Sequence, residues 1–243
     1  MNQRNDDMYN QYYNGGGMDF GYAAPDAAVY QGVLTRAFLY MVVALGITAV
    51  AAFTTADLIL IWMLRNPYSL YILFAVEIGI VIASNWALRR NNTVLSAVLF
   101  AAYSFINGAT IGIILLAYTE TSVGASFLMA GGMFAVMAVY GMVTKKDLSS
   151  WGSILLMGLI GIIIASLVNL IFLRNGMMDF VVSLAAIAIF VGLTAYDTQK
   201  LKKRAMMASG SSMEAIALMG AFELYLDFVN LFLRLLSIMG KRK

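Results

Sequence analysis

Long apolar runs separated by short polar stretches occupy most of the chain. Each run has roughly 20 or more residues, which is enough to cross a bilayer as a helix. None alternates in the manner of a barrel strand, and a backbone in lipid must satisfy its own hydrogen bonds. The pattern predicts an all-α membrane protein, a seven-transmembrane-helix bundle over 33–243. Its spans lie approximately at 33–53, 68–88, 94–117, 123–143, 153–173, 177–197 and 214–239.

Two segments fall outside these runs. Residues 1–32 are polar and include three consecutive glycines, so we expect a disordered N-terminal tail. No apolar core follows a basic start there, which argues against a cleaved signal peptide. The stretch 54–67 mixes apolar residues with Asp57 and Arg65. We interpret it as an interfacial segment, with a longer first helix as the alternative.

Positive charge is distributed unevenly between the loops. The loops after the first, third and fifth spans hold only Arg65 and Arg174. The loops after the second, fourth and sixth spans hold eight basic residues: Arg89, Arg90, Lys145, Lys146, Lys200, Lys202, Lys203 and Arg204. The positive-inside rule therefore predicts a cytoplasmic N-terminus and an outer C-terminus. The basic tail 241–243 disagrees, and a re-entrant or half-length last helix would resolve the conflict.

Composition narrows the class of function. The chain is 61% hydrophobic and 12% charged, and its mean hydropathy is +0.81, whereas a soluble domain carries about 25% charged residues. It has no cysteine and no histidine, so proton chemistry must use carboxylates, tyrosine or lysine. We expect a protein of the lipid bilayer that is not an enzyme, needs no cofactor and binds no nucleic acid.

Ionisable side chains inside the spans are the functional candidates, because each costs free energy in lipid. Glu77 stands alone in the second span, and Asp197 lies near the end of the sixth. The last span carries a polar stripe, because its spacings of three and four residues place these side chains on one helical face. The stripe consists of Glu223, Asp227, Asn230 and Arg234.

The sixth helix is expected to continue past Asp197 to about Arg204. If the last helix starts near Glu214, Asp197 and Asp227 lie at similar depth on neighbouring antiparallel helices. Two carboxyls facing each other in a low dielectric cannot both ionise cheaply, so the pair can hold one proton and act as a pH-sensitive latch. Glu77 has two open interpretations: a role in ion passage, or a hydrogen-bonded carboxyl beside a residue such as Asn107 or Asn169. Small residues are expected to let helices pack closely, namely Gly108, Gly112, Gly131, Gly132, Gly158 and Gly161.

Four ordered stretches resemble the transmembrane Bax-inhibitor motif family in its bacterial branch. The most characteristic is FVGLTAYDTQKLK at 190–202. The others are YGMVTKKDL at 140–148, the segment 159–169, and LYLDFVNLF at 224–232. Together the four stretches support a resemblance over about residues 30–240.

The resemblance implies a seven-helix protein of the bacterial inner membrane that acts as a pH-sensitive calcium leak, with protons and calcium as its ligands. Asp197 and Asp227 correspond to the family's pH-sensing pair, and Glu77 to a carboxylate of its ion pathway. Glu223 and Asn230 are expected along that pathway. The cationic partners of the pair are expected among Arg89, Arg90 and Arg234. A weak, transient calcium site is expected at Asp197, Asp227 and Glu77.

Two rival functions differ in kind. An intramembrane aspartyl protease would need a Gly-x-Gly-Asp motif, whereas Asp227 follows Leu-Tyr-Leu, and no proline follows Pro67. The second rival, which we keep as the alternative, is a non-transporting regulator that binds a membrane-bound protease or another membrane protein.

Overall fold

The structure is a computed structural model, and it describes residues 27–90, 92–207 and 212–243. Within these ranges it is helical, apart from short turns and one isolated β-bridge. Seven helices are long and apolar enough to cross a membrane, as predicted. The helices are α2 (Ala27–Arg65), α3 (Ser69–Arg89), α4 (Thr93–Leu116), α5 (Glu120–Val143), α6 (Ser149–Val168) with a final π-helical turn η1 (Asn169–Leu173), α7 (Gly176–Met206) and α8 (Ser212–Met239).

The first helix differs most from its predicted bounds. It runs without a break for 39 residues to Arg65, so the separate interfacial segment at 54–67 is wrong and the longer first helix is confirmed. It also begins at Ala27, so residues 27–32 belong to it and not to a tail. The rest of that tail lies outside the described residues.

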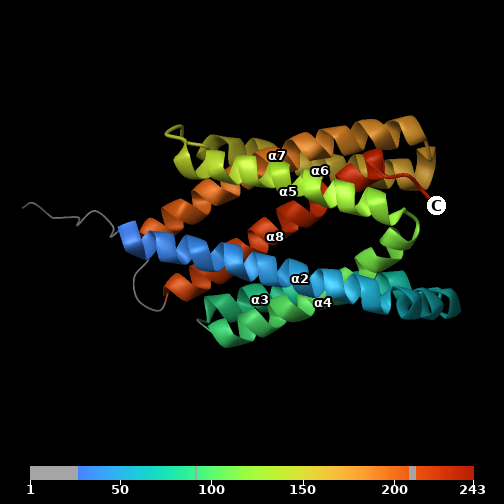
Figure 1. Cartoon of the computed structure of the whole chain (residues 1–243), viewed down its shortest axis with the longest axis horizontal. Coiled ribbons are helices and arrows are strands. Elements are labelled where there is room, and N and C mark those ends of the chain that lie inside the picture. The colour runs from blue at the N-terminus through green and yellow to red at the C-terminus, as the bar shows by residue number, and fades with distance from the viewer. Residues whose placement is uncertain (1–26, 91, 208–211) are drawn as a thin grey trace, which may run out of the picture.

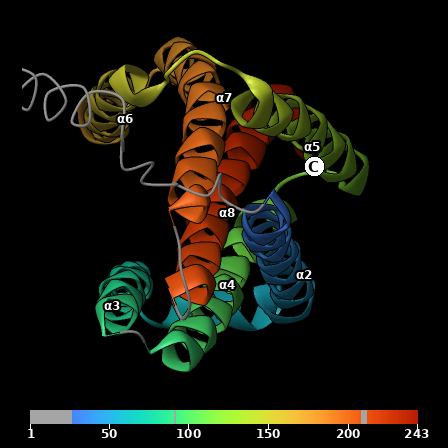
Figure 2. The same ribbon diagram turned by 90° about the vertical axis from the view of Figure 1, so that its left-hand side faces the viewer.

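Helix α8 forms the axis of the bundle (Figures 1 and 2). It packs against α7, α2, α5 and α4, and 61% of its spanning window is buried. Helices α2, α3 and α4 lie on one side of it, and α5, α6 and α7 on the other (Figure 2). The outermost helices, α3 and α6, pack mainly on α4 and α7 respectively. Any side chain on the buried faces of α8 therefore lies inside the protein.

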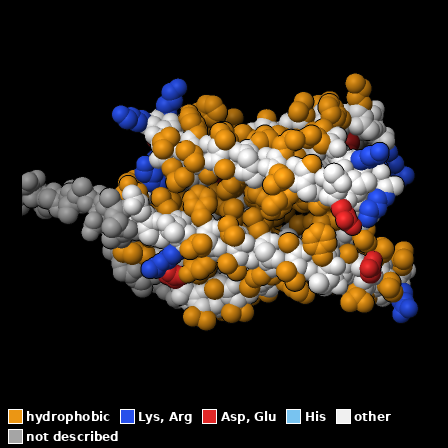
Figure 3. All heavy atoms as spheres, in the orientation of Figure 1, with side chains coloured by type: hydrophobic (Ala, Val, Ile, Leu, Met, Phe, Trp, Pro, Cys, Tyr) orange, Lys and Arg blue, Asp and Glu red, His pale blue; other side chains and the backbone are white. Residues whose placement is uncertain are grey.

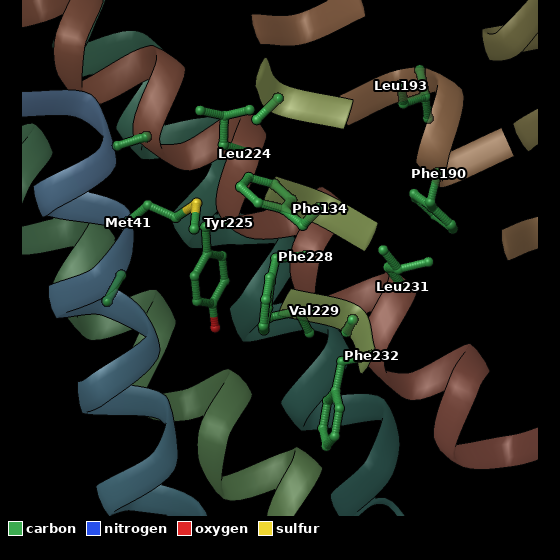
Figure 4. Packing of buried hydrophobic residues seen from close by; sticks show 14 of the residues in the cluster. Met41, Phe134, Phe190, Leu193, Leu224, Tyr225, Phe228, Val229, Leu231 and Phe232 are labelled. Carbon is green, nitrogen blue, oxygen red and sulfur yellow. The ribbon is translucent and has the colours of Figure 1, made fainter. Parts of the chain in front are cut away.

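Apolar side chains fill the interior and also cover the lipid-facing surface (Figures 3 and 4). Edge-to-face aromatic pairs join α8 to its neighbours, for example Phe228 to Phe134 of α5 and Tyr225 to Phe100 of α4. Such pairs add about 0.5–1.5 kcal/mol beyond the burial of their area. They fix the rotation of α8 and hence the direction of its polar stripe.

The C-terminus lies at the opposite end of the bundle from the start of α2 (Figure 1). Helix α8 has 28 residues, so a re-entrant or half-length last helix is wrong. After it, the tail is held against the α4–α5 turn by two backbone hydrogen bonds, Thr119 N to Lys241 O and Lys243 N to Ala117 O, each 3.0 Å long. These bonds hold the basic tail in place, and we call residues 241–243 the pinned strap.

Candidate functional site

The two aspartates meet at the seam between α7 and α8. Helix α7 continues to Met206, as expected, and brings the carboxyl of Asp197 close enough to that of Asp227 for the two to interact electrostatically. Asp227 is only 5% exposed, and its Oδ2 atom is buried with no hydrogen-bond partner among the described residues. An unpartnered buried carboxylate oxygen is costly, so this is the polar group whose environment most needs a functional explanation.

Two cations complete the cluster. Lys200 Nζ lies 3.3 Å from Asp197 Oδ1 and 2.8 Å from Glu223 Oε1. Arg204 Nη1 lies 3.4 Å from Glu223 Oε1. We call these five residues, Asp197, Lys200, Arg204, Glu223 and Asp227, the seam cluster. It holds three carboxyls and two cations, so one negative charge is in excess when every group is ionised.

Lys200 and Arg204, and not the predicted arginines, are the cations beside the carboxyls. Arg90 stacks on Trp86 of its own helix, with its Cζ atom 4.1 Å from the ring centroid, while Arg89 has no described side chain. Arg234 approaches Ser183 of α7 at 3.5 Å and forms no ion pair with a described residue. From the sequence, Lys200 and Arg204 contribute only to the predicted membrane orientation, through the positive-inside rule.

The rest of the stripe also faces α7 but is less connected. The amide of Asn230 donates to Leu226 O of its own helix at 2.8 Å. Arg234 follows Asp227 by seven residues, about 10 Å along the axis, which explains why it does not reach the pair. The polar residues of α8 thus line one seam, and the charges that interact gather at one end of it.

Glu77 belongs to a different polar network. Its Oε1 accepts a hydrogen bond from Thr110 Oγ1 at 2.8 Å, and its carboxyl also bonds Asn107. Asn107 Oδ1 in turn accepts from the hydroxyl of Tyr225 at 3.2 Å, which lies 2.7 Å from Thr48 Oγ1. Of the two neighbours expected for Glu77, Asn107 is therefore correct. Asn169 instead bonds the backbone of residue 175 in the α6–α7 turn.

This second network joins α3, α4, α8 and α2 on the side of α8 turned away from the seam. Tyr225 and Asp227 are two residues apart, about 200° around the helix. Among the described residues, no group of three or more acidic side chains is arranged to hold a metal ion. Glu77 thus belongs to a different network from the two aspartates, and the three carboxyls predicted to share a weak calcium site are not gathered in one place among the described residues.

The end of α7 also fixes the α5–α6 loop. Gln199 donates through Nε2 to Lys146 O and accepts from Leu148 N, both at 2.8 Å, and Lys203 pairs with Asp147. Two of the four stretches that carry the family resemblance, 140–148 and 190–202, are therefore in contact. These bonds hold α7 in place, and with it Asp197 and Lys200.

The ion pair at this loop gives a pH-dependent prediction. The hydrogen bond from Lys203 holds the pKa of Asp147 well below its usual range. A carboxyl with a depressed pKa stabilises the fold above its ordinary pKa, and that contribution disappears as the pH falls through its value in the folded protein. In Lys203→Met, we expect Asp147 to titrate at a higher pH, measured from its side-chain carbon by NMR. Lys241→Met at the other end of the molecule should leave the titration unchanged, and equal curves for all three proteins would refute the pairing.

Comparison with known proteins identifies the family. The family described as Inhibitor of apoptosis-promoting Bax1 matches residues 30–243. The chain belongs to this family. Among its relatives, a protein of Rickettsia prowazekii is 39% identical over 213 residues, covering 86% of this chain and 89% of the relative. The inner membrane protein YbhL of Escherichia coli is 36% identical over 218 residues, covering 88% and 93%.

A protein of Borreliella burgdorferi is 38% identical over 214 residues, covering 86% of this chain and 92% of the relative. The resemblance read from the four motifs is thus confirmed as a family assignment. With seven spanning helices and a relative named as an inner membrane protein, this member of the Bax-inhibitor family is a multi-pass protein of the bacterial inner membrane.

Proposed function

We propose that this Bax-inhibitor family member is a pH-sensitive cation leak, that calcium is the ion it passes, and that the aspartate pair is its gate. The observation that supports this most is the buried Asp227 carboxyl, which faces Asp197 and has an oxygen without a partner among the described residues. A spanning helix seldom keeps such a group unless it serves function. We further propose that the activity is passage alone, without catalysis or a bound cofactor.

The gate would work through the charge of the seam cluster. With one proton on the pair, three carboxyls and two cations are balanced, and a shared hydrogen bond ties α7 to α8. Without that proton the excess negative charge either separates the two helices or attracts a cation. Calcium prefers six to eight oxygen ligands, more than two carboxyls supply, which suits passage better than storage.

Calcium flux into liposomes that carry the purified protein tests the proposal. We expect wild-type flux to change between about pH 5 and pH 8. Asparagine is a neutral, similarly shaped substitute for a protonated aspartate. Asp197→Asn and Asp227→Asn should therefore hold the flux at the wild-type acid-limit value across the whole range. Glu77→Gln tests the separate contribution of the second network.

Asp179→Asn is the matched control, because Asp179 lies on α7, the helix of Asp197, but in its exposed first turn. It should leave the pH response intact. Wild-type liposomes that leak no faster than empty ones at any pH would overturn the proposal. The alternative, a non-transporting regulator of a membrane-bound protease or other membrane protein, would then take its place, and a partner retained by both aspartate variants would support it.

A further inference from the structure

A large apolar groove lies between α2 and α5, apart from the seam cluster, and Thr48 of the second network lies on its lining. Its volume is about 510 Å³. Helix α2 packs against α4 and α8, and α5 packs against α7 and α8, so α8 forms part of the groove floor. The space-filling view shows the hollow between the two helices, lined by apolar side chains (Figure 3). The walls and floor include Phe53 of α2, Gly124 and Phe127 of α5, and Phe228 and Phe232 of α8.

The groove opens sideways, toward the acyl chains of the surrounding lipid. Phe53 on one wall is 73% exposed and Phe127 on the other is 45% exposed. Both belong to candidate spanning segments, where exposed aromatic side chains are suited to contact with hydrocarbon. An occupant can therefore enter from the bilayer without crossing the polar surface.

One end of the groove is charged. Asp57 near the end of α2, Glu120 at the start of α5 and Lys243 of the pinned strap all line it. Asp57 and Glu120 form no ion pair with a described residue, and both are exposed. Acidic side chains are visible at this end of the groove in Figure 3. The lining thus joins an apolar slot to a charged mouth.

The size of the groove favours a thin occupant. A helix about 10 Å across fills roughly 400 Å³ for every turn of 5.4 Å, so the groove could enclose little more than one turn of a spanning helix. An acyl chain is thin enough to lie along the slot, and the bilayer supplies it at high concentration.

We infer that the groove binds one phospholipid whose headgroup carries an ammonium, as phosphatidylethanolamine does. Its acyl chain lies in the slot, its ammonium lies between Asp57 and Glu120, and its phosphate faces Lys243. An anionic phospholipid would instead place its net charge beside two carboxylates. This inference does not depend on the proposed ion leak.

Substitutions at two glycines of α5 test whether the slot holds lipid. A side chain added at Gly124 or at Gly132 meets open space, and both residues are exposed, but only Gly124 lines the groove. Leucine favours the helix over glycine at both positions. Native mass spectrometry after mixing with detergent micelles that contain phosphatidylethanolamine should show one retained lipid in wild type and Gly132→Leu. Gly124→Leu should lose most of it.

The headgroup is tested by competition between phosphatidylethanolamine and phosphatidylglycerol with identical chains. Wild type should retain the ammonium lipid with a preference of roughly fivefold, the size of one exposed ion pair. Asp57→Asn combined with Glu120→Gln should abolish that preference, and Asp179→Asn should keep it. Equal retention of both lipids by wild type, or undiminished retention by Gly124→Leu, would overturn the inference.

Discussion

Replacing Gly108 by valine is expected to push α2 away from α4 and to destabilise the bundle by about 3 kcal/mol. A Cβ atom at Gly108 would meet the backbone of Thr48, and one at Gly112, a turn later, would meet the backbone of Ala52. Overpacking costs about 1–3 kcal/mol when side chains can adjust. Here the obstacle is backbone, so the helices themselves must move, and we expect the upper end of that range.

The effect should be measured as the free energy of unfolding in detergent, or as the thermal midpoint followed by tryptophan fluorescence. Gly46→Val is the matched control, since Gly46 is an exposed α2 glycine whose added side chain meets open space. It should change stability little. If both valine variants unfold at the same temperature, the close approach of α2 and α4 at Gly108 is not what stabilises this crossing.

The glycines show how far the sequence alone could lead. Six were expected at helix contacts, and Gly108, Gly112 and Gly158 do lie against a neighbouring helix. A Cβ added at Gly131, Gly132 or Gly161 meets nothing within 4 Å, so for these three the expectation is wrong. In a membrane protein lipid is as apolar as the core, so hydropathy does not reveal which face of a helix packs.

Polar residues carried more information, because lipid penalises them and so limits where they can point. This reasoning predicted that Asp197 and Asp227 would lie level, and they do. The same reasoning did not identify Lys200 as a partner of the aspartates. A lysine near a helix end is expected from the positive-inside rule as well as from an ion pair, and the residue type alone does not separate the two. Its spacing from Asp197, three residues on one helical face, was the available signal. For Glu77 the sequence left two candidate neighbours, Asn107 and Asn169, because helix order does not determine which helices α3 contacts.

Replacing Lys200 by methionine is expected to destabilise the protein by about 3 kcal/mol. Among the described residues, Lys200 is the one cation in contact with both Asp197 and Glu223. Removing one partner from a buried ion pair costs about 3–5 kcal/mol, because the other charge is left uncompensated. We expect the lower end, since the Lys200 side chain remains 27% exposed and water screens part of the charge. The free energy of unfolding of the purified protein measures the effect.

A second substitution separates charge from packing. In Lys200→Met the seam cluster holds three carboxyls and one cation, and adding Asp197→Asn restores the original excess of a single negative charge. The double variant should therefore recover most of the lost stability. Lys145→Met is the control, because Lys145 is an exposed lysine outside the cluster, and it should cost little. If the double variant is no more stable than Lys200→Met, the loss comes from packing of the lysine stem, and the electrostatic account of the seam is wrong.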